Sequence, residues 1–271
     1  MSTRTLVWGT CVCAGFAATL LAGVDARANE RRFTYTYESL VLNPGDVELE
    51  PWTTFRIGRR DFYTRMDNRL EFEFGVVDGL QTAWYFNWSS TTQDKDGARV
   101  HGSSFESVSN EWKLKLSDPV ADALGSALYL EGSAGPSEAE LEAKVIVDKR
   151  FGPVVFALNL VGEHEWEFEE DETEREVGAE IDLGLGWLVS DRFSLGVEVR
   201  NVNEIKPEDG WEHSALFAGP AASYSSEKWW TAVTILPQVL KLKGEEEDEG
   251  SSLVLSGRER LEARVLFGIH L

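Results

Sequence analysis

Cysteine is absent from most of this chain, because its two copies, Cys11 and Cys13, both lie within the first 28 residues. The remaining residues therefore cannot form a disulfide, a thiolate nucleophile or a zinc–thiolate site. They also contain no apolar run that approaches the roughly 20 residues of a membrane-spanning helix, and helical periodicity is almost absent from them. If this part of the chain crosses a membrane, strands must do so.

The start of the chain, MSTRTLVWGTCVCAGFAATLLAGVDARANE, has the layout of a secretory signal peptide. Arg4 provides a basic start, residues 6–24 form an apolar run, and a small-residue site ends at Ala28. We predict that residues 1–28 are a signal peptide that is cleaved after Ala28. The alternative is an uncleaved membrane anchor, flanked by the two arginines that follow the site.

Positive charge is also scarce. The signal peptide holds two of the 26 basic and one of the 47 acidic residues, so residues 29–271 keep 24 and 46, a net charge of −22. A surface this acidic repels nucleic acid, and we expect no nucleic-acid partner. The acidity is not that of a disordered tail, because apolar and aromatic residues recur throughout. The length suits one large domain.

Period-two alternation, the pattern of a strand with two different faces, is abundant. In RLEFEFGVV, residues 69–77, apolar side chains alternate with Arg69, Glu71 and Glu73, and the Asp-Gly pair that follows is a hairpin signal. The same pattern predicts twelve strands, at residues 47–58, 65–76, 80–90, 105–117, 126–135, 138–150, 154–168, 175–188, 193–203, 213–225, 229–242 and 257–271.

Tight turns and polar connections alternate along the chain, as in an up-and-down membrane barrel with short periplasmic turns and longer outer loops. We therefore predict an all-β fold, an antiparallel transmembrane β-barrel of about 12 strands over residues 47–271, in the bacterial outer membrane. An even number of strands places both ends of the barrel in the periplasm. A soluble β-sandwich is the alternative, but its strands average about five or six residues, and the predicted strands are longer.

One alternating run, FTYTY at residues 33–37, falls outside this strand count. We interpret residues 29–46 as an N-terminal extension in the periplasm or in the lumen. The alternative is that this run adds a strand while two other strands merge. None of the connections is long enough to plug a barrel, which argues against a receptor for large ligands.

The two faces of the predicted strands differ in polarity. One face is apolar over about nine residues, roughly what a tilted strand needs to cross a bilayer, and we expect outer-membrane lipids to contact it. Aromatic residues gather near the strand ends, as they do at membrane interfaces. We expect an outer belt of Trp88, Trp166 and Phe168 and a periplasmic belt of Phe151, Trp187, Phe193, Trp229 and Trp230.

The opposite face is charged and would surround a narrow, wet lumen. The candidates for lining a pore are Glu71, Glu73, Lys113, Lys115, Glu140, Glu142, Lys144, Glu180, Asp182, Glu198 and Arg200. Acids well inside the strands would create a field that favours cations, and these acids are Glu71, Glu73, Glu140, Glu142, Glu180 and Asp182. The alternative is that ion pairs between these acids and the bases brace a closed tube.

Three segments, YESLVLNPGDVELEPWTTFRIG, LEFEFGVVDGLQTAWYFNW and LSDPVADALGSALYLEG, resemble segments of uncharacterised Gram-negative outer-membrane barrels. These barrels are loosely similar to the transporter-like barrels associated with aromatic-degradation pathways. The resemblance covers most of residues 29–271 and implies that the last strand is the insertion signal read by the barrel-assembly machinery. Such strands usually end in Phe, whereas this one ends in Leu271.

Sequence motifs for catalysis and for metal binding are missing. Neither Gly-x-Ser-x-Gly nor His-Glu-x-x-His occurs, and His101, the only loop histidine, lies beside two serines without a matched acid. The DKDG segment at residues 94–97 is only part of a calcium loop, and the acidic runs 169–176 and 245–249 are more typical of solvated loops than of cation sites. We expect no enzyme, no cofactor and no metal site.

The function predicted from the sequence is an outer-membrane channel or transporter-like barrel that passes small solutes or ions with a preference for cations. The alternatives are a non-conducting structural or interaction barrel, and an outer-membrane enzyme whose site the sequence does not reveal. The expected partners are outer-membrane lipids and the barrel-assembly machinery, with small solutes or ions as the cargo of a channel.

Overall fold

The computed structural model describes residues 30–168, 173–207, 210–244 and 246–271. The predicted signal peptide, residues 1–28, lies outside them. Within the described residues, no helix combines the length and the apolar character needed to span a membrane. The one helix that these residues form is the short 3-10 helix η1 (Glu246–Asp248).

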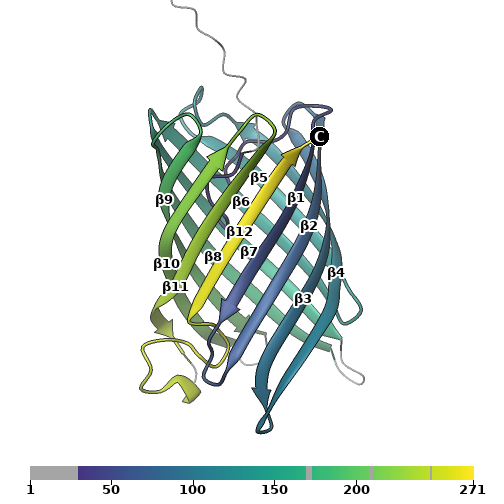
Figure 1. Cartoon of the computed structure of the whole chain (residues 1–271), viewed down its shortest axis with the longest axis vertical. Coiled ribbons are helices and arrows are strands. Elements are labelled where there is room, and N and C mark those ends of the chain that lie inside the picture. Colours follow the sequence, from purple (N-terminus) through teal and green to yellow (C-terminus); the bar gives the residue numbers. More distant parts are fainter. Residues whose placement is uncertain (1–29, 169–172, 208–209, 245) are drawn as a thin grey trace, which may run out of the picture.

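Twelve antiparallel strands form a closed barrel, in which β1 pairs with β12 at the seam (Figure 1). This arrangement confirms the predicted all-β, up-and-down fold. The strands are β1 (Val47–Ile57), β2 (Tyr63–Val77), β3 (Leu80–Lys95), β4 (Ala98–Ser117), β5 (Gly125–Ala134), β6 (Glu138–Phe151), β7 (Val154–Phe168), β8 (Thr173–Leu188), β9 (Phe193–Lys206), β10 (Gly210–Ser225), β11 (Trp229–Lys243) and β12 (Leu261–His270). The barrel begins and ends at the same end, where the amide of Leu271 donates to the carbonyl of Val47 at 3.0 Å.

Alternation along each strand divides the side chains between the exterior and the lumen. In β3, Trp84 and Phe86 are 50% and 45% exposed, whereas Tyr85 between them is fully buried. In β8, Leu185 is exposed and Asp182 is buried. An apolar exterior around a polar interior is the arrangement of a transmembrane barrel. With the closed topology, it confirms the predicted outer-membrane location.

The last strand, β12, follows the same alternation and closes the barrel. Leu266, the apolar residue that interrupts the alternation in the sequence, is fully buried and packs against Trp230 inside the barrel. The expectation that Trp230 joins the periplasmic aromatic belt is therefore wrong, because its indole nitrogen donates to the carboxylate of Glu48 in the lumen at 2.6 Å. Its neighbour Trp229 lies outside and stacks on Phe267, with ring centroids 5.5 Å apart.

The predicted strands differ from the observed ones mainly at the end opposite the chain terminus, here named the loop end. The polar stretch 91–104, predicted as a loop, continues β3 and β4 to a two-residue turn at Asp96 and Gly97, which have φ values of 54° and 76°. Residues 257–260, predicted as part of the last strand, belong to the β11–β12 connection. Arg260 still shares backbone hydrogen bonds with Gly58 and Gln238, and the preceding residue, Glu259, pairs with Arg59 at 2.6 Å.

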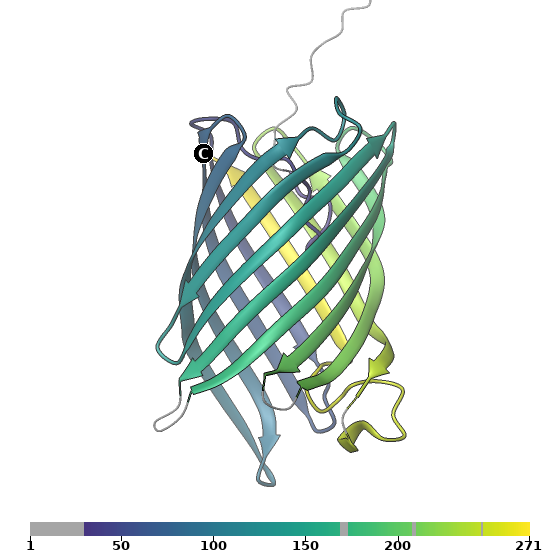
Figure 2. The same cartoon turned by 180° about the vertical axis from the view of Figure 1, so that it is seen from behind.

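Residues 30–46, named the N-terminal segment, lie inside the barrel near the opposite end, named the turn end (Figures 1 and 2). Phe33, Tyr35 and Tyr37 are buried against three separate clusters of wall residues. Among the described residues, this run forms no strand. Of the two places predicted for this extension, the periplasm and the lumen, the structure shows the lumen. The expectation that no connection is long enough to plug the barrel overlooks this segment, which fills part of the lumen.

Candidate functional site: the barrel lumen

A single carboxylate holds the N-terminal segment in the lumen. Glu198, in β9, is fully buried, and its two oxygens accept hydrogen bonds from the backbone amides of Thr34, Tyr35 and Thr36 at 2.7–3.0 Å. Two threonine hydroxyls donate to the same carboxylate. Hydrogen bonds to an ionised acceptor are stronger than neutral ones, so Glu198 is the main anchor of the segment.

Other side chains of the wall also pair with the backbone of the segment. Asn159, in β7, accepts from the amide of Tyr37 at 2.6 Å and donates to its carbonyl at 2.9 Å, as a neighbouring strand would. Gln81 and Asp148 accept from amides further along the segment at 3.0 and 3.3 Å. These contacts satisfy backbone groups that would otherwise be buried without partners.

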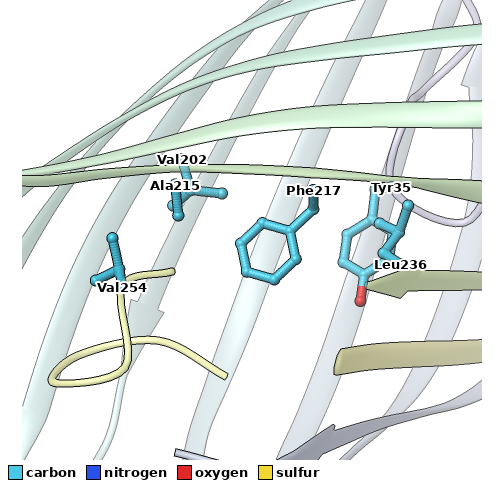
Figure 3. Close-up of a cluster of buried hydrophobic side chains, with 6 residues drawn as sticks. All are labelled: Tyr35, Val202, Ala215, Phe217, Leu236 and Val254. Atoms are coloured by element: carbon cyan, nitrogen blue, oxygen red, sulfur yellow. The ribbon is translucent and has the colours of Figure 1, made fainter. Parts of the chain in front are cut away.

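Tyr35 contacts both charged and apolar side chains of the barrel wall. Its ring lies between the guanidinium groups of Arg200 and Arg264, whose central carbons are 4.0 and 3.7 Å from the ring centroid. Such cation–π contacts gain strength when they are shielded from water. The same ring belongs to a buried apolar cluster that contains Phe217 and Val254 (Figure 3). Val254 comes from the β11–β12 connection, so segments from both ends of the barrel share this cluster.

The β11–β12 connection, residues 244–260, folds into the loop end of the lumen. The side-chain amide of Gln238 accepts from the amide of Val254 at 2.6 Å and donates to its carbonyl at 2.9 Å. Asp248 is buried and accepts from two backbone amides further along the connection at 2.8 and 3.2 Å. Asp248 also contacts Arg60 at 3.7 Å, and its carbonyl accepts from Lys241 of β11 at 2.5 Å, so the acidic run 245–249, expected to be a solvated loop, is tied to the barrel. Residue 245 lies outside the described residues.

Beyond the N-terminal segment, the lumen holds a cavity of about 570 Å³, named the vestibule. Its lining includes 12 acidic and seven basic side chains. Strands β6, β7 and β8 contribute acids and no bases, and these acids, named the acidic wall, are Glu138, Glu140, Glu163, Glu165, Glu167, Glu176 and Glu180. The bases come from other parts of the lining and are Arg56, Arg59, Arg65, Arg69, Arg200, Arg258 and Arg264.

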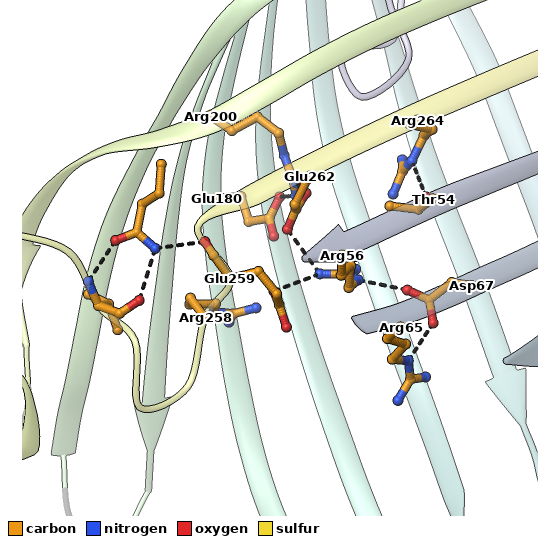
Figure 4. A network of polar contacts seen from close by, with 12 residues as sticks. Thr54, Arg56, Arg65, Asp67, Glu180, Arg200, Arg258, Glu259, Glu262 and Arg264 are labelled. Carbon is orange, nitrogen blue, oxygen red and sulfur yellow. Dashed lines mark hydrogen bonds and ion pairs between the residues drawn. The ribbon is translucent and has the colours of Figure 1, made fainter. Parts of the chain in front are cut away.

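Most of these arginines are neutralised by ion pairs (Figure 4). Arg56 contacts Asp67 at 2.7 Å and Glu262 at 3.0 Å. Arg200 contacts Glu180 at 2.6 Å and Glu262 at 2.9 Å. Six members of the acidic wall have no ion pair within 4.0 Å in the part of the chain that the structure describes, and they are Glu138, Glu140, Glu163, Glu165, Glu167 and Glu176. The unpaired carboxyl groups of the vestibule are therefore concentrated on the acidic wall.

Only some of the predicted pore-lining residues border the vestibule, and these are Glu140, Glu180 and Arg200. Asp182 is buried beside Arg200 at 3.3 Å, and Glu142 pairs with Lys144 at 2.9 Å. Glu198 faces the N-terminal segment rather than open space. The six acids expected to form one field are thus separated. Some line the vestibule, some form ion pairs, and others lie at the turn end.

The remaining predicted residues lie toward the turn end. Glu71, Glu73 and Lys113 are buried on the lumen face of β2 and β4. Lys115 lies at the rim, where its ammonium group donates to the carboxylate of Asp118 at 2.7 Å. This hydrogen bond and two backbone amides of the β4–β5 turn lower the pKa of Asp118 to about 2. Lys115, near the end of β4, therefore contacts the β4–β5 turn and does not line the vestibule.

The N-terminal segment is a functional element that the predicted set of pore-lining residues omits. Its alternation at residues 33–37 predicts an extended chain but not its partners, which are side chains of the wall instead of a neighbouring strand. Three buried carboxylates, those of Glu48, Glu50 and Glu111, are also missing from the set, although alternation places all three on the charged face.

The chain can now be compared with known proteins. Residues 25–271 match a family whose description reads "Family of unknown function (DUF6662)". The chain belongs to this family. No curated protein matches the chain. Membership of this family fits the predicted resemblance to uncharacterised outer-membrane barrels.

Several solved outer-membrane barrels share the fold of this family member. The COG4313 outer membrane channel from Pseudomonas putida F1 has a TM-score of 0.61 at 12% identity, covering 89% of this chain and 100% of that chain. The translocator domain of the autotransporter NalP from Neisseria meningitidis has a TM-score of 0.51 at 11% identity, covering 84% and 90%. The NanC porin has a TM-score of 0.50 at 11% identity, covering 82% and 100%. At such identities the similarity shows the fold alone.

Proposed function

We propose that this protein is an outer-membrane channel that passes small cations, with the vestibule as the charged entrance. The acidic wall is the observation that supports this function best. Carboxylates that face a confined, wet space raise the local concentration of cations, and rings of Asp and Glu are typical of cation channels. The arginines of the vestibule weaken this field little, because most of them are already paired with acids.

The N-terminal segment is then the constriction between the vestibule and the periplasm. It lies across the lumen and is fixed by Glu198 and Asn159. Ions would pass beside this segment or after its displacement from Glu198. The vestibule itself is wide enough for hydrated ions, at about 570 Å³.

A non-conducting structural barrel is the second candidate, and the packing of the same segment favours it. Phe33 and Tyr35 are 1% and 3% exposed, and the backbone around them is hydrogen-bonded to the wall. The packed N-terminal segment and the ion pairs among charged side chains of the vestibule would also stabilise a closed barrel that does not conduct.

We further infer that the protein is not an enzyme. His101 lies beside Ser103 and Ser104 in the sequence, but its Nδ1 lies 2.9 Å from the hydroxyl of Thr92. The hydroxyl of Ser103 pairs with that of Ser90, and Ser104 donates to a glutamate. This hydrogen bonding supplies no activated serine.

The exterior of the barrel supports the expected partners. We infer that outer-membrane lipids contact the apolar outward face, to which β8 contributes Ile181 and Leu185. We also infer that the barrel-assembly machinery reads β12, the strand that closes the barrel against β1.

The reversal potential of the refolded protein in a planar bilayer under a salt gradient tests the proposed function. We expect a small conductance that prefers cations, and a weaker preference in Glu163→Gln/Glu165→Gln, which removes two charges from the acidic wall. Asp191→Asn/Glu227→Gln removes the same charge from exposed turns and should leave the preference unchanged. A preference for anions in the unmodified protein would overturn the proposal, and an absence of conductance would favour the structural barrel.

A further inference from the structure

Five buried carboxylates meet on the lumen wall at the turn end of the barrel. Glu48 and Glu50 of β1, Glu71 and Glu73 of β2, and Glu111 of β4 are each at most 3% exposed. In the β1–β2 register, Glu48 lies opposite Glu73 and Glu50 lies opposite Glu71. Like charges directly opposite each other destabilise a sheet, so this arrangement requires compensation.

The spacing of these carboxylates matches the shell of a metal ion. Oxygens of Glu48, Glu50 and Glu73 lie within 4.8 Å of one another, and so do oxygens of Glu71, Glu73 and Glu111. Glu73 belongs to both groups and joins them. Calcium binds oxygens at about 2.4 Å, so ligands on opposite sides of the ion are about 4.8 Å apart.

Some of these oxygens are buried without a hydrogen-bond donor. Both carboxylate oxygens of Glu50 and one of Glu71 have no donor within reach in the described part of the chain. Donors do reach the other three members of the cluster. Gln81 donates to Glu73 at 3.2 Å, Tyr85 donates to Glu111, and the indole nitrogen of Trp230 donates to Glu48 at 2.6 Å. A buried carboxylate is costly unless a charge or a donor compensates it. This cost is largest for Glu50, because neither of its oxygens has a donor among the described residues.

Nearby protein cations cannot balance the cluster. Arg31 and Lys113 are the two cationic side chains that face it. Nδ1 of His270 lies 2.5 Å from the carboxylate of Glu48, so three basic side chains stand against five carboxylates. The guanidinium of Arg31 is also engaged elsewhere, because it donates to the carbonyl of Thr34 at 2.9 Å and stacks 3.9 Å from the ring centroid of Tyr37. No ion pair within 4.0 Å joins either cationic side chain to Glu50 or Glu71 among the described residues.

We propose that this cluster binds a calcium ion beside Glu73, the residue common to both groups, with Glu50 and Glu71 as the ligands that each group adds. The donors are all oxygens, which suit a hard cation rather than zinc or copper. A small cavity of about 10 Å³, lined in part by Glu73 and Lys113, adjoins the cluster at the turn end. The ion ties β1, β2 and β4 together behind the N-terminal segment. This site is separate from the vestibule, so it stands whether or not the barrel conducts.

Terbium luminescence tests this site, because Trp230 donates a hydrogen bond to Glu48 at 2.6 Å and can transfer excitation to a bound terbium ion. In the refolded protein we expect a saturable terbium signal that calcium displaces. Glu50→Gln/Glu71→Gln, which keeps shape and removes two ligand charges, should weaken calcium binding about tenfold or more. The matched control is Asp191→Asn/Glu227→Gln, two acids of exposed turns, and it should bind calcium as the unmodified protein does.

The unfolding temperature gives a second readout that does not depend on luminescence. Calcium should raise it in the unmodified protein relative to EDTA, and should not change it in Glu50→Gln/Glu71→Gln. In EDTA the double variant should be the more stable of the two, because it lacks two repelling carboxylates. Unchanged calcium affinity in this variant, or no calcium-displaceable signal in the unmodified protein, would overturn the site and would favour protons shared between the carboxyls.

Discussion

Carboxylates on the lumen face have different roles at the scale of single residues, and the group opposite each one decides its role. Glu198 accepts from three backbone amides and holds the N-terminal segment. Glu262 accepts from Arg56 and Arg200 and braces the wall. Glu163 faces the open vestibule and has no ion-pair partner within 4.0 Å among the described residues. All three occur at alternating inward positions, so alternation alone does not distinguish them.

Leu183 provides a test of which face meets lipid. It lies on the outward face of β8, between Ile181 and Leu185, which are 44% and 56% exposed. Leu183→Arg should lower the free energy of unfolding by about 2–4 kcal/mol, because mid-bilayer lipid does not solvate the charge. Glu163→Arg places the same side chain in the vestibule beside Glu140 and should cost much less. Urea unfolding in lipid vesicles measures both, and equal losses would show that the faces are misassigned.

Asp182 shows what face assignment from the sequence leaves out. Alternation places it inward, which suggests that Asp182→Arg would be mild. The structure buries Asp182 against Arg200 at 3.3 Å, so an arginine there would meet a second arginine in a closed space. Glu163, which borders the vestibule, is therefore the matched control for Leu183.

At the scale of elements, the N-terminal segment behaves as a removable part of the lumen. It contributes no strand, and polar side chains of β3, β6, β7 and β9 hold its backbone. The barrel strands pair with one another, and the segment shares backbone hydrogen bonds with β2 at its end, where Gly45 and Asp46 bond to Gly75. The barrel therefore does not need residues 30–43 for the pairing of its strands.

Glu198→Ala/Asn159→Ala should release the segment and leave the barrel intact. Each lost partner leaves buried backbone amides unsatisfied, at about 1–3 kcal/mol apiece. We expect faster hydrogen exchange at the amides of residues 34–37, with unchanged exchange in the strands. Glu165→Ala, in the vestibule, is the control and should leave exchange in the segment unchanged. Continued protection of residues 34–37 in the double variant would contradict the anchoring role of Glu198.

The strands could be predicted from the sequence because a single rule, alternation, governs every strand that separates lipid from water. The rule fails where both faces are polar, as at residues 91–104, and where the chain folds into the mouth, as at residues 257–260. It also fails at Trp230, since a large apolar side chain can fill the lumen beside Leu266. The lumen contacts join residues far apart in the sequence, such as Thr34 and Glu198, and no local pattern encodes them.

At the scale of the whole molecule, the barrel divides its interior into two compartments. The vestibule at the loop end is open, acidic and lined largely by charged groups. The turn end is filled by the N-terminal segment and by the buried carboxylates of β1, β2 and β4. We therefore predict that the vestibule determines ion selectivity and that the N-terminal segment closes the lumen. Mutations should then change one property without changing the other.

Single-channel recording on the refolded protein with and without residues 30–43 tests this division most directly. Removal of these residues should raise the conductance markedly, because it empties the turn end, and should keep the preference for cations, because the acidic wall is untouched. A folded barrel changes its gel mobility when it is heated. Any preparation without this change is not a folded barrel and is excluded from the comparison. A folded, truncated barrel whose conductance equals that of the intact protein, or one that prefers anions, would contradict the account.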